Sequence, residues 1–280
     1  MADMNTLAWI IGFTLLGGVA GVLLASVFLL VPENSRRHAL PFMVAFATGA
    51  LLAAALLGLL PEAIEKAGPD NYGKVGLSLL GGIALFFVLE KLVLWRHCHE
   101  DDCETHSPEP ADSHGHGHGH GSDHGHGDAH RRAPGVMIIF GDTMHNALDG
   151  VLIAAAFLID VNLGIMTGLA VLAHEVPSEV GNFAIMLHSG MSRAKAFGWN
   201  LFSALGSVLG GVLGYLTLSR LQPWLPYALG VSAASLLYVA VADLIPGLHR
   251  RVGAKDSFLQ VILIAAGVAL VAVVEHLHPH

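Results

Sequence analysis

The chain has 280 residues, of which 54% are hydrophobic and only 13% charged, and its mean hydropathy is +0.61. Because soluble globular domains carry about 25% charged residues, this composition excludes that class and indicates an all-α integral membrane protein. The net charge of −8 comes largely from one acidic, histidine-rich segment, and no stretch resembles a basic nucleic-acid-binding surface. Cys98 and Cys103 cannot make a disulfide framework.

Hydropathy predicts eight transmembrane helices, since a span needs about 20 apolar residues. The first apolar run is too long for a signal-peptide core and lacks a basic flank, so we expect it to be retained. The eight predicted spans are 7–31, 40–63, 75–95, 135–158, 163–187, 196–219, 225–248 and 257–277.

The distribution of lysine and arginine predicts the orientation of the chain, because cytoplasmic loops carry an excess of both residues. Eleven of them fall on one side of the predicted spans: Arg36, Arg37, Lys91, Arg96, Arg131, Arg132, Arg193, Lys195, Arg250, Arg251 and Lys255. Three fall on the other side: Lys66, Lys74 and Arg220. We therefore expect a multi-pass protein of the plasma (inner) membrane, with both termini outside and the long histidine-rich loop in the cytoplasm.

Two short motifs recur in the same order in the two halves of the chain. Span 1 contains L-G-G-V-A-G-V-L from Leu16, and span 6 contains L-G-G-V-L-G-Y-L from Leu209. Span 2 ends in L-L-P-E-A from Leu59, and span 7 ends in L-I-P-G-L from Leu244. Corresponding spans run in opposite directions, which is typical of transporters built as inverted repeats. We predict a 3+2+3 arrangement, with spans 1–3 (residues 1–96) and 6–8 (188–280) around central spans 4 and 5 (135–187).

The loop between spans 3 and 4, residues 97–134, differs from the rest of the chain. It holds ten histidines, several of them alternating with glycine between His114 and His126. Glycine between ligands opposes stable structure, so we expect a disordered segment with several weak metal sites.

The central spans carry ionisable residues near the middle of segments long enough to cross a bilayer. Such residues are costly there and usually mark an ion path. His145 and Asp149 are four residues apart and share a helical face, with Asn146 beside them. In the next span, His174 and Ser178 share one face, and Glu175, Glu179 and Asn182 the adjoining one. Carboxylates gathered without a cation would repel one another, and imidazole, carboxylate and amide ligands suit zinc or ferrous iron. These residues therefore predict a metal site.

The two motifs, H-N-A-L-D-G from His145 and H-E-V-P-S-E-V-G-N from His174, resemble the paired signatures of the ZIP (Zrt-, Irt-like protein) metal transporters. The resemblance covers essentially the whole chain. It implies that His145, Asn146, Asp149, His174 and Glu175 are transport-site ligands. It also implies uptake of zinc or related ions into the cytoplasm, movement of one helix bundle against another, and dimer formation in many members. No prosthetic group is expected; the ligand is transported Zn²⁺, and Fe²⁺, Mn²⁺ and Cd²⁺ can use the same donors.

The chain departs from the family pattern at three positions. Ser178 stands where the motif usually has histidine or glutamate, Asn182 replaces aspartate, and Gly58 stands where histidine is common. We therefore expect one principal ion rather than a two-metal site. Ser178, directly or through water, and Glu179, as a supporting or exit residue, complete the predicted metal-site residues. Glu62 and Asp243 are candidates for lining the path.

Two other functions use part of the same pattern. The spacing of His145 and Asp149 also fits a cation-diffusion exporter, although eight spans, outside termini and the second motif argue against it. His174-Glu175 begins like the H-E-x-x-H motif of zinc hydrolases, but Ser178 stands where the second histidine is required. We therefore expect a transporter working by alternating access, not an enzyme. Whether uptake is coupled to proton movement stays open.

Overall fold

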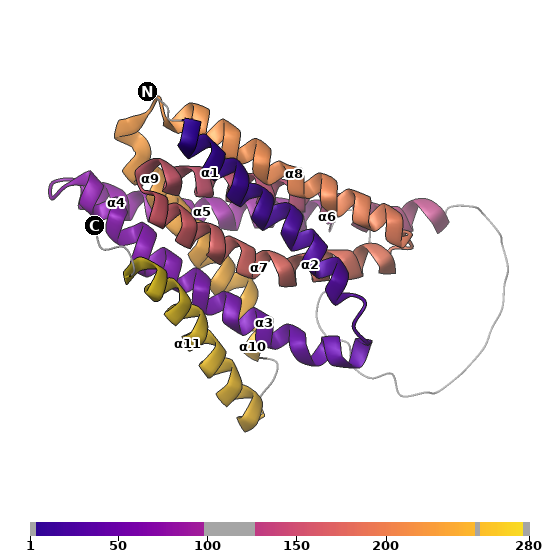
Figure 1. The fold of residues 1–280 in the computed structure, drawn as a ribbon. Helices are drawn as coiled ribbons and strands as arrows, with labels where there is room; N and C mark the ends of the chain where they lie inside the picture. The colour runs from indigo at the N-terminus through magenta and orange to yellow at the C-terminus, as the bar shows by residue number, and fades with distance from the viewer. Residues whose placement is uncertain (1–3, 98–126, 250–252, 277–280) are drawn as a thin grey trace, which may run out of the picture.

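The structure is a computed structural model, which describes residues 4–97, 127–249 and 253–276. Every regular element in these ranges is helical, and none is a strand. Most of the predicted histidine-rich loop, including its run of histidines, lies outside the described residues. Figure 1 shows the helices packed side by side as a bundle of long rods.

The described helices form eight rods in chain order. The first joins α1 (Met4–Leu15), η1 (Leu16–Ala20) and α2 (Gly21–Phe28), and the second joins α3 (Glu33–Ala53), η2 (Ala54–Leu59) and α4 (Leu60–Ala67). Four single helices follow: α5 (Tyr72–His97), α6 (Gly127–Ile159), α7 (Val161–His188) and α8 (Arg193–Leu218). The seventh rod joins η3 (Gln222–Trp224), α9 (Leu225–Tyr238), η4 (Val239–Leu244) and α10 (Ile245–His249), and the last is α11 (Ala254–His276).

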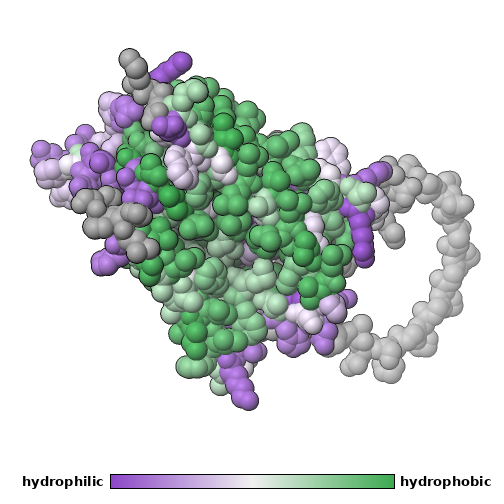
Figure 2. Space-filling view, viewed as in Figure 1, coloured by the Kyte–Doolittle hydropathy of each residue, from purple (hydrophilic) through white to green (hydrophobic). Residues whose placement is uncertain are grey.

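Within the described ranges, seven of these rods are long and apolar enough to cross a membrane. The eighth, α7, has 28 residues and is therefore about 42 Å long, but its polar residues around His174 lower its hydropathy. Figure 2 shows an apolar surface over the middle of the visible face, with hydrophilic residues gathered toward its ends. The protein is an all-α integral membrane protein.

The helices begin earlier than the apolar pattern predicts. The second rod begins at Glu33 and α6 begins at Gly127, whereas the predicted spans begin at residues 40 and 135. Polar residues such as Asn34 and Arg131 extend these helices beyond their apolar middles. Hydropathy detects only the part that is apolar enough for lipid, so it places the start too late.

The second and seventh rods share an unusual local structure. Each contains a six-residue π-helical segment, η2 or η4, followed directly by a helix with proline at its second position, Pro61 or Pro246. Proline cannot donate to the carbonyl four residues earlier, and its ring clashes with that carbonyl, so the preceding turn widens. In the packing, α3 lies along α11 and α5 lies along α9. These matched pairings are what an inverted repeat would give; the complete 3+2+3 arrangement stays a prediction.

The two central helices, α6 and α7, have the most neighbours among the rods. α6 packs against α8, α7, α1 and α9, and α7 packs against α6, α3, α2 and α8. The connection between them is the single residue Asp160, whose carboxylate accepts hydrogen bonds from the backbone N–H groups of Asn162 (2.7 Å) and Leu163 (3.3 Å). This cap ends one helix and starts the next in the opposite direction, so the middles of α6 and α7 face each other.

Candidate metal site

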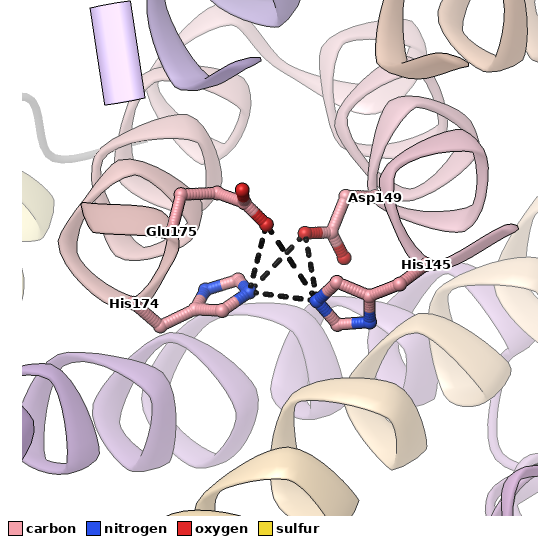
Figure 3. A group of neighbouring side chains, drawn as sticks. All are labelled: His145, Asp149, His174 and Glu175. Carbon is pink, nitrogen blue, oxygen red and sulfur yellow. Dashed lines mark hydrogen bonds and ion pairs between the residues drawn. The ribbon is translucent and has the colours of Figure 1, made fainter. Parts of the chain in front are cut away.

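Two consecutive helices supply all four members of a compact polar cluster. His145 and Asp149 lie one turn apart on α6, and His174 and Glu175 are adjacent on α7. Figure 3 shows the four side chains pointing toward a common centre from opposite sides. One atom from each residue, two imidazole nitrogens and two carboxylate oxygens, lies within 4.8 Å of the others.

The separations between these atoms are short and similar. His174 Nε2 lies 3.2 Å from Asp149 Oδ2 and 3.6 Å from Glu175 Oε1. His145 Nε2 lies 3.7 Å from Asp149 Oδ2, 3.6 Å from Glu175 Oε1 and 3.2 Å from His174 Nε2. The two imidazole rings are nearly perpendicular, at 82°. The four donor atoms therefore converge on one point, and the side chains do not merely stack.

The cluster is buried except on one side. Asp149, His174 and Glu175 are 2%, 2% and 1% exposed, whereas the His145 side chain is 29% exposed. Neither carboxylate oxygen of Glu175 accepts a hydrogen bond from the described residues. A buried carboxylate without partners is costly, and a cation at the centre of the cluster would remove that cost.

The orientation of His174 is fixed by its own helix. Its Nδ1 lies 3.3 Å from the carbonyl oxygen of Ala170, one turn earlier on α7. When Nδ1–H donates to this carbonyl, the lone pair of Nε2 faces the cluster. Metal-binding histidines commonly use their second nitrogen in this way.

Glycine sets the position of α6 against its main neighbour, α8. A Cβ at Gly150 would lie 1.9 Å from the carbonyl oxygen of Ser207, and a Cβ at Gly210 would lie 1.9 Å from that of Ala147. No side chain fits between the two backbones at these points. Because Ala147 lies between His145 and Asp149, this close contact fixes the part of α6 that carries them.

The geometry of the cluster fits a tetrahedral cation. Zinc binds histidine nitrogen and carboxylate oxygen at about 2.0–2.2 Å, which places the ligand atoms of a tetrahedron about 3.3–3.6 Å apart. Five of the six separations range from 3.2 to 3.7 Å, and the sixth, between the two carboxylate oxygens, is within 4.8 Å. The spacing of the four donor atoms therefore suits an ion of the size of zinc.

Comparison with known proteins adds a second line of evidence. A family model described as the ZIP zinc transporter matches residues 6–275, nearly the whole chain. The chain belongs to the ZIP zinc transporter family.

Several curated ZIP relatives have similar sequences. Zinc transporter SLC39A7 of Rattus norvegicus is 30% identical, over 88% of this chain and 68% of its own length. Zinc transporter ZIP13 of Mus musculus is 29% identical, over 81% of this chain and 67% of its own length. ZIP13 of Danio rerio is 27% identical, over 82% and 74%. The matched region thus spans about two thirds of the first two relatives.

Three other predicted site residues of this ZIP protein lie outside the group of four. Asn146 is buried, and its amide nitrogen donates to the backbone carbonyl of Asp142 at 3.1 Å. Ser178 is partly exposed. Glu179 is completely buried, with no hydrogen-bond partner for either carboxylate oxygen among the described residues.

Asp142 was not predicted from the sequence; it is 9% exposed and accepts a 2.7 Å hydrogen bond from the amide of Asn182. Its spacing could have identified it, because Asp142 lies three residues before His145 and four before Asn146 on α6. Glu90, which accepts a hydrogen bond from the Tyr238 hydroxyl, was not predicted either.

A cavity of about 440 Å³ opens beside the cluster of this ZIP protein. Its lining includes His145 together with Glu90, Tyr238 and Asp243, and is otherwise largely apolar. Asp243 was a candidate for the path, and it lies in this lining. Glu62, the other candidate, lines a separate cavity of about 170 Å³ with Gly58 and pairs with Lys66 at 3.3 Å. Of the four-residue cluster, His145 alone lines the cavity of about 440 Å³.

Proposed function

We propose that this chain transports divalent metal cations, with zinc as the preferred substrate, into the cytoplasm by alternating access at the cluster of His145, Asp149, His174 and Glu175. The observation that carries the proposal is the convergence of four donor atoms, five of whose six separations are close to the edge length of a zinc tetrahedron. The zinc transporters named above, to which the chain is similar, support the same substrate.

The surroundings of the cluster support alternating access. On the side of the α6–α7 connection, Ile153, Phe157 and Met166 are buried in the main hydrophobic core, so this side is closed. On the opposite side, His145 borders the cavity lined by Glu90 and Asp243. One closed and one open side is the expected form of a single state of a transporter whose site lies between two moving bundles.

The charges of the loops support an orientation in which the open side of the described state faces the cytoplasm. The cavity is lined by the later part of α5 and the middle of α6, and it lies on the side of the cluster nearer the end of α5 and the start of α6. The excess of lysine and arginine favours a cytoplasmic position for these ends. The described state would then be open inward, and the termini would lie outside.

The proposal can be tested by zinc uptake into proteoliposomes or zinc-starved cells. We expect His174→Ala to abolish inward flux, because it removes a buried ligand. His38→Ala is the matched control, since His38 is exposed on α3 and lies away from the cluster. A variant lacking residues 106–126 should retain flux if the histidine-rich loop is an accessory to the site.

Two outcomes would reject the proposal. Equal flux in wild type and His174→Ala, with both proteins folded and equally abundant, would show that the cluster is not on the transport path. Outward rather than inward flux down a matched zinc gradient would reject the direction. Measurement of peptide hydrolysis by the same purified protein would test the alternative hydrolase function directly.

A further inference from the structure

A second buried polar group lies next to the four-residue cluster, and its chemistry is different. It consists of Asp142 on α6 and Glu179 and Asn182 on α7, which we call the acidic-amide cluster. Glu179 lies one turn beyond Glu175, and Asp142 lies one turn before His145. At about 1.5 Å per residue, Glu179 is displaced by about 6 Å along α7 toward the end of that helix. This is also the direction of residues 98–126, which precede α6.

Two members of the acidic-amide cluster, Asp142 and Asn182, contact each other across the two helices. The Asn182 amide donates to Asp142 Oδ1 at 2.7 Å, which leaves the carbonyl oxygen of the same amide available as a ligand. Asp142 also accepts a hydrogen bond from Ser203 on α8. The carboxylates of Asp142 and Glu175 both act electrostatically on Glu179, which follows Glu175 by four residues on α7.

The burial of Glu179 is the observation that most needs an explanation. The residue is 0% exposed, and neither of its carboxylate oxygens has a hydrogen-bond partner among the described residues. The charged groups that act on it are both carboxylates, Asp142 and Glu175, and no lysine, arginine or histidine is among them. Buried charges are normally paired or bound to a metal. A cation between Glu179 and Asp142 would supply the missing partner.

We propose that Asp142, Glu179 and Asn182 form a second binding site for a divalent cation, through which the ion passes between the four-residue cluster and the cytoplasm. This proposal rests on the proposed function, since it gives the transported ion its next position. It is separate from the two-metal site that the sequence argues against, because it needs no bridging ligand at Ser178.

The ligand chemistry suits a site of passage. All three side chains offer oxygen and none offers imidazole, so zinc should be held less tightly here than at the cluster with two histidines. Carboxylate and carbonyl oxygens also accept harder ions such as Mn²⁺. An ion moving from mixed nitrogen and oxygen ligands to oxygen ligands alone therefore moves toward weaker binding, which favours release.

The test is to count Mn²⁺ ions bound to the purified full-length chain, using the loss of the free Mn²⁺ electron paramagnetic resonance signal. We expect Glu179→Gln to bind one Mn²⁺ fewer per chain than wild type. The matched control is Glu65→Gln, which removes an exposed carboxylate away from both clusters and should leave the number unchanged. His174→Ala should lose one ion at the first cluster, and the double variant should lose two. Contributions of the histidine-rich loop are the same in every variant and cancel.

A second variant keeps the proposal testable if Glu179→Gln does not fold. Asn182→Asp adds a carboxylate, and divalent ions bind oxygen sites more tightly as the charge of the ligands rises. We expect Mn²⁺ binding at this site to tighten by about tenfold. The second site is rejected if folded Glu179→Gln binds as many ions as wild type, or if Asn182→Asp leaves the affinity unchanged. Failure of the proposed function would instead appear as normal zinc flux in His174→Ala, which the Mn²⁺ count does not measure.

Discussion

Gly210→Ala tests whether the contact between α6 and α8 sets the geometry of the metal site. A Cβ at position 210 would lie 1.9 Å from the carbonyl oxygen of Ala147, and real Cβ contacts essentially never fall below 3.0 Å. The two helices must therefore separate locally by about 1.1 Å, the difference between these values. Ala147 is two residues from both His145 and Asp149, so both ligands move with it.

A shift of this size exceeds what a metal site tolerates. Ligand distances in such sites hold within about 0.2 Å, and misplacement by about 1 Å can cost about 100-fold in rate. We expect zinc flux to fall by about that factor, and overpacking to lower the free energy of unfolding by about 1–3 kcal/mol. Flux into proteoliposomes and thermal unfolding in detergent measure the two effects.

The matched control is Gly198→Ala on the same helix. A Cβ at position 198 meets nothing within 4 Å, so this change should preserve flux and raise the free energy of unfolding by up to about 1 kcal/mol. If Gly210→Ala and Gly198→Ala both transport zinc like wild type and unfold at the same temperature, the close contact does not position the site, and the reasoning is wrong.

Three further substitutions test other parts of the structure. Asp149→Asn replaces an anionic ligand by a neutral one. Zinc affinity, measured by isothermal titration calorimetry, should fall by more than about 100-fold, because about 100-fold is already the upper range for loss of a residue that only supports a ligand. Unchanged affinity would show that Asp149 is not part of the site. Asp160→Ala removes the cap of α7 and should cost about 0.5–2 kcal/mol, seen as a lower melting temperature; an equal melting temperature would contradict this. Ser178→His adds an imidazole one turn after His174, and should lower both KM and kcat for zinc uptake by about tenfold; a lower KM with a higher kcat would refute the view that weak ligands favour release.

The sequence predicts the number and order of the helices well, because a membrane span has a simple physical requirement. About 20 apolar residues are needed to cross the hydrocarbon core, and such runs are visible without knowledge of the packing. The ends of the helices are harder to predict, as the early start of α6 at Gly127 illustrates. The π-helical segments before Pro61 and Pro246 were not predicted, since proline restricts the backbone without determining how the preceding turns respond.

Some residues of the candidate site were likewise predicted from the sequence, and others were not. The four-residue spacing between His145 and Asp149 predicts a shared face on one helix, and the resemblance to ZIP transporters supplies their partners on the next. Asp142 was missed because its role depends on Asn182, a residue 40 positions away. Glu90 was missed because its hydrogen bond comes from Tyr238, 148 positions away. The contact between two helices has no signature in a single sequence, although the spacing of Asp142 from His145 on its own helix was a signal.

The asymmetric burial of the four ligands gives a physical reason why an ion could leave this site. A structural zinc site is closed on all sides, whereas here only three ligands are fully enclosed and His145 borders a cavity. If these four residues bind the transported ion as proposed, exchange would begin at His145, where water can replace the imidazole without opening the core. The ion would then remain bound to Asp149, His174 and Glu175, with Glu179 one turn further along α7. Each step exchanges one ligand for another, so the ion need not lose all its ligands at once, and the barrier to release is divided among several smaller ones.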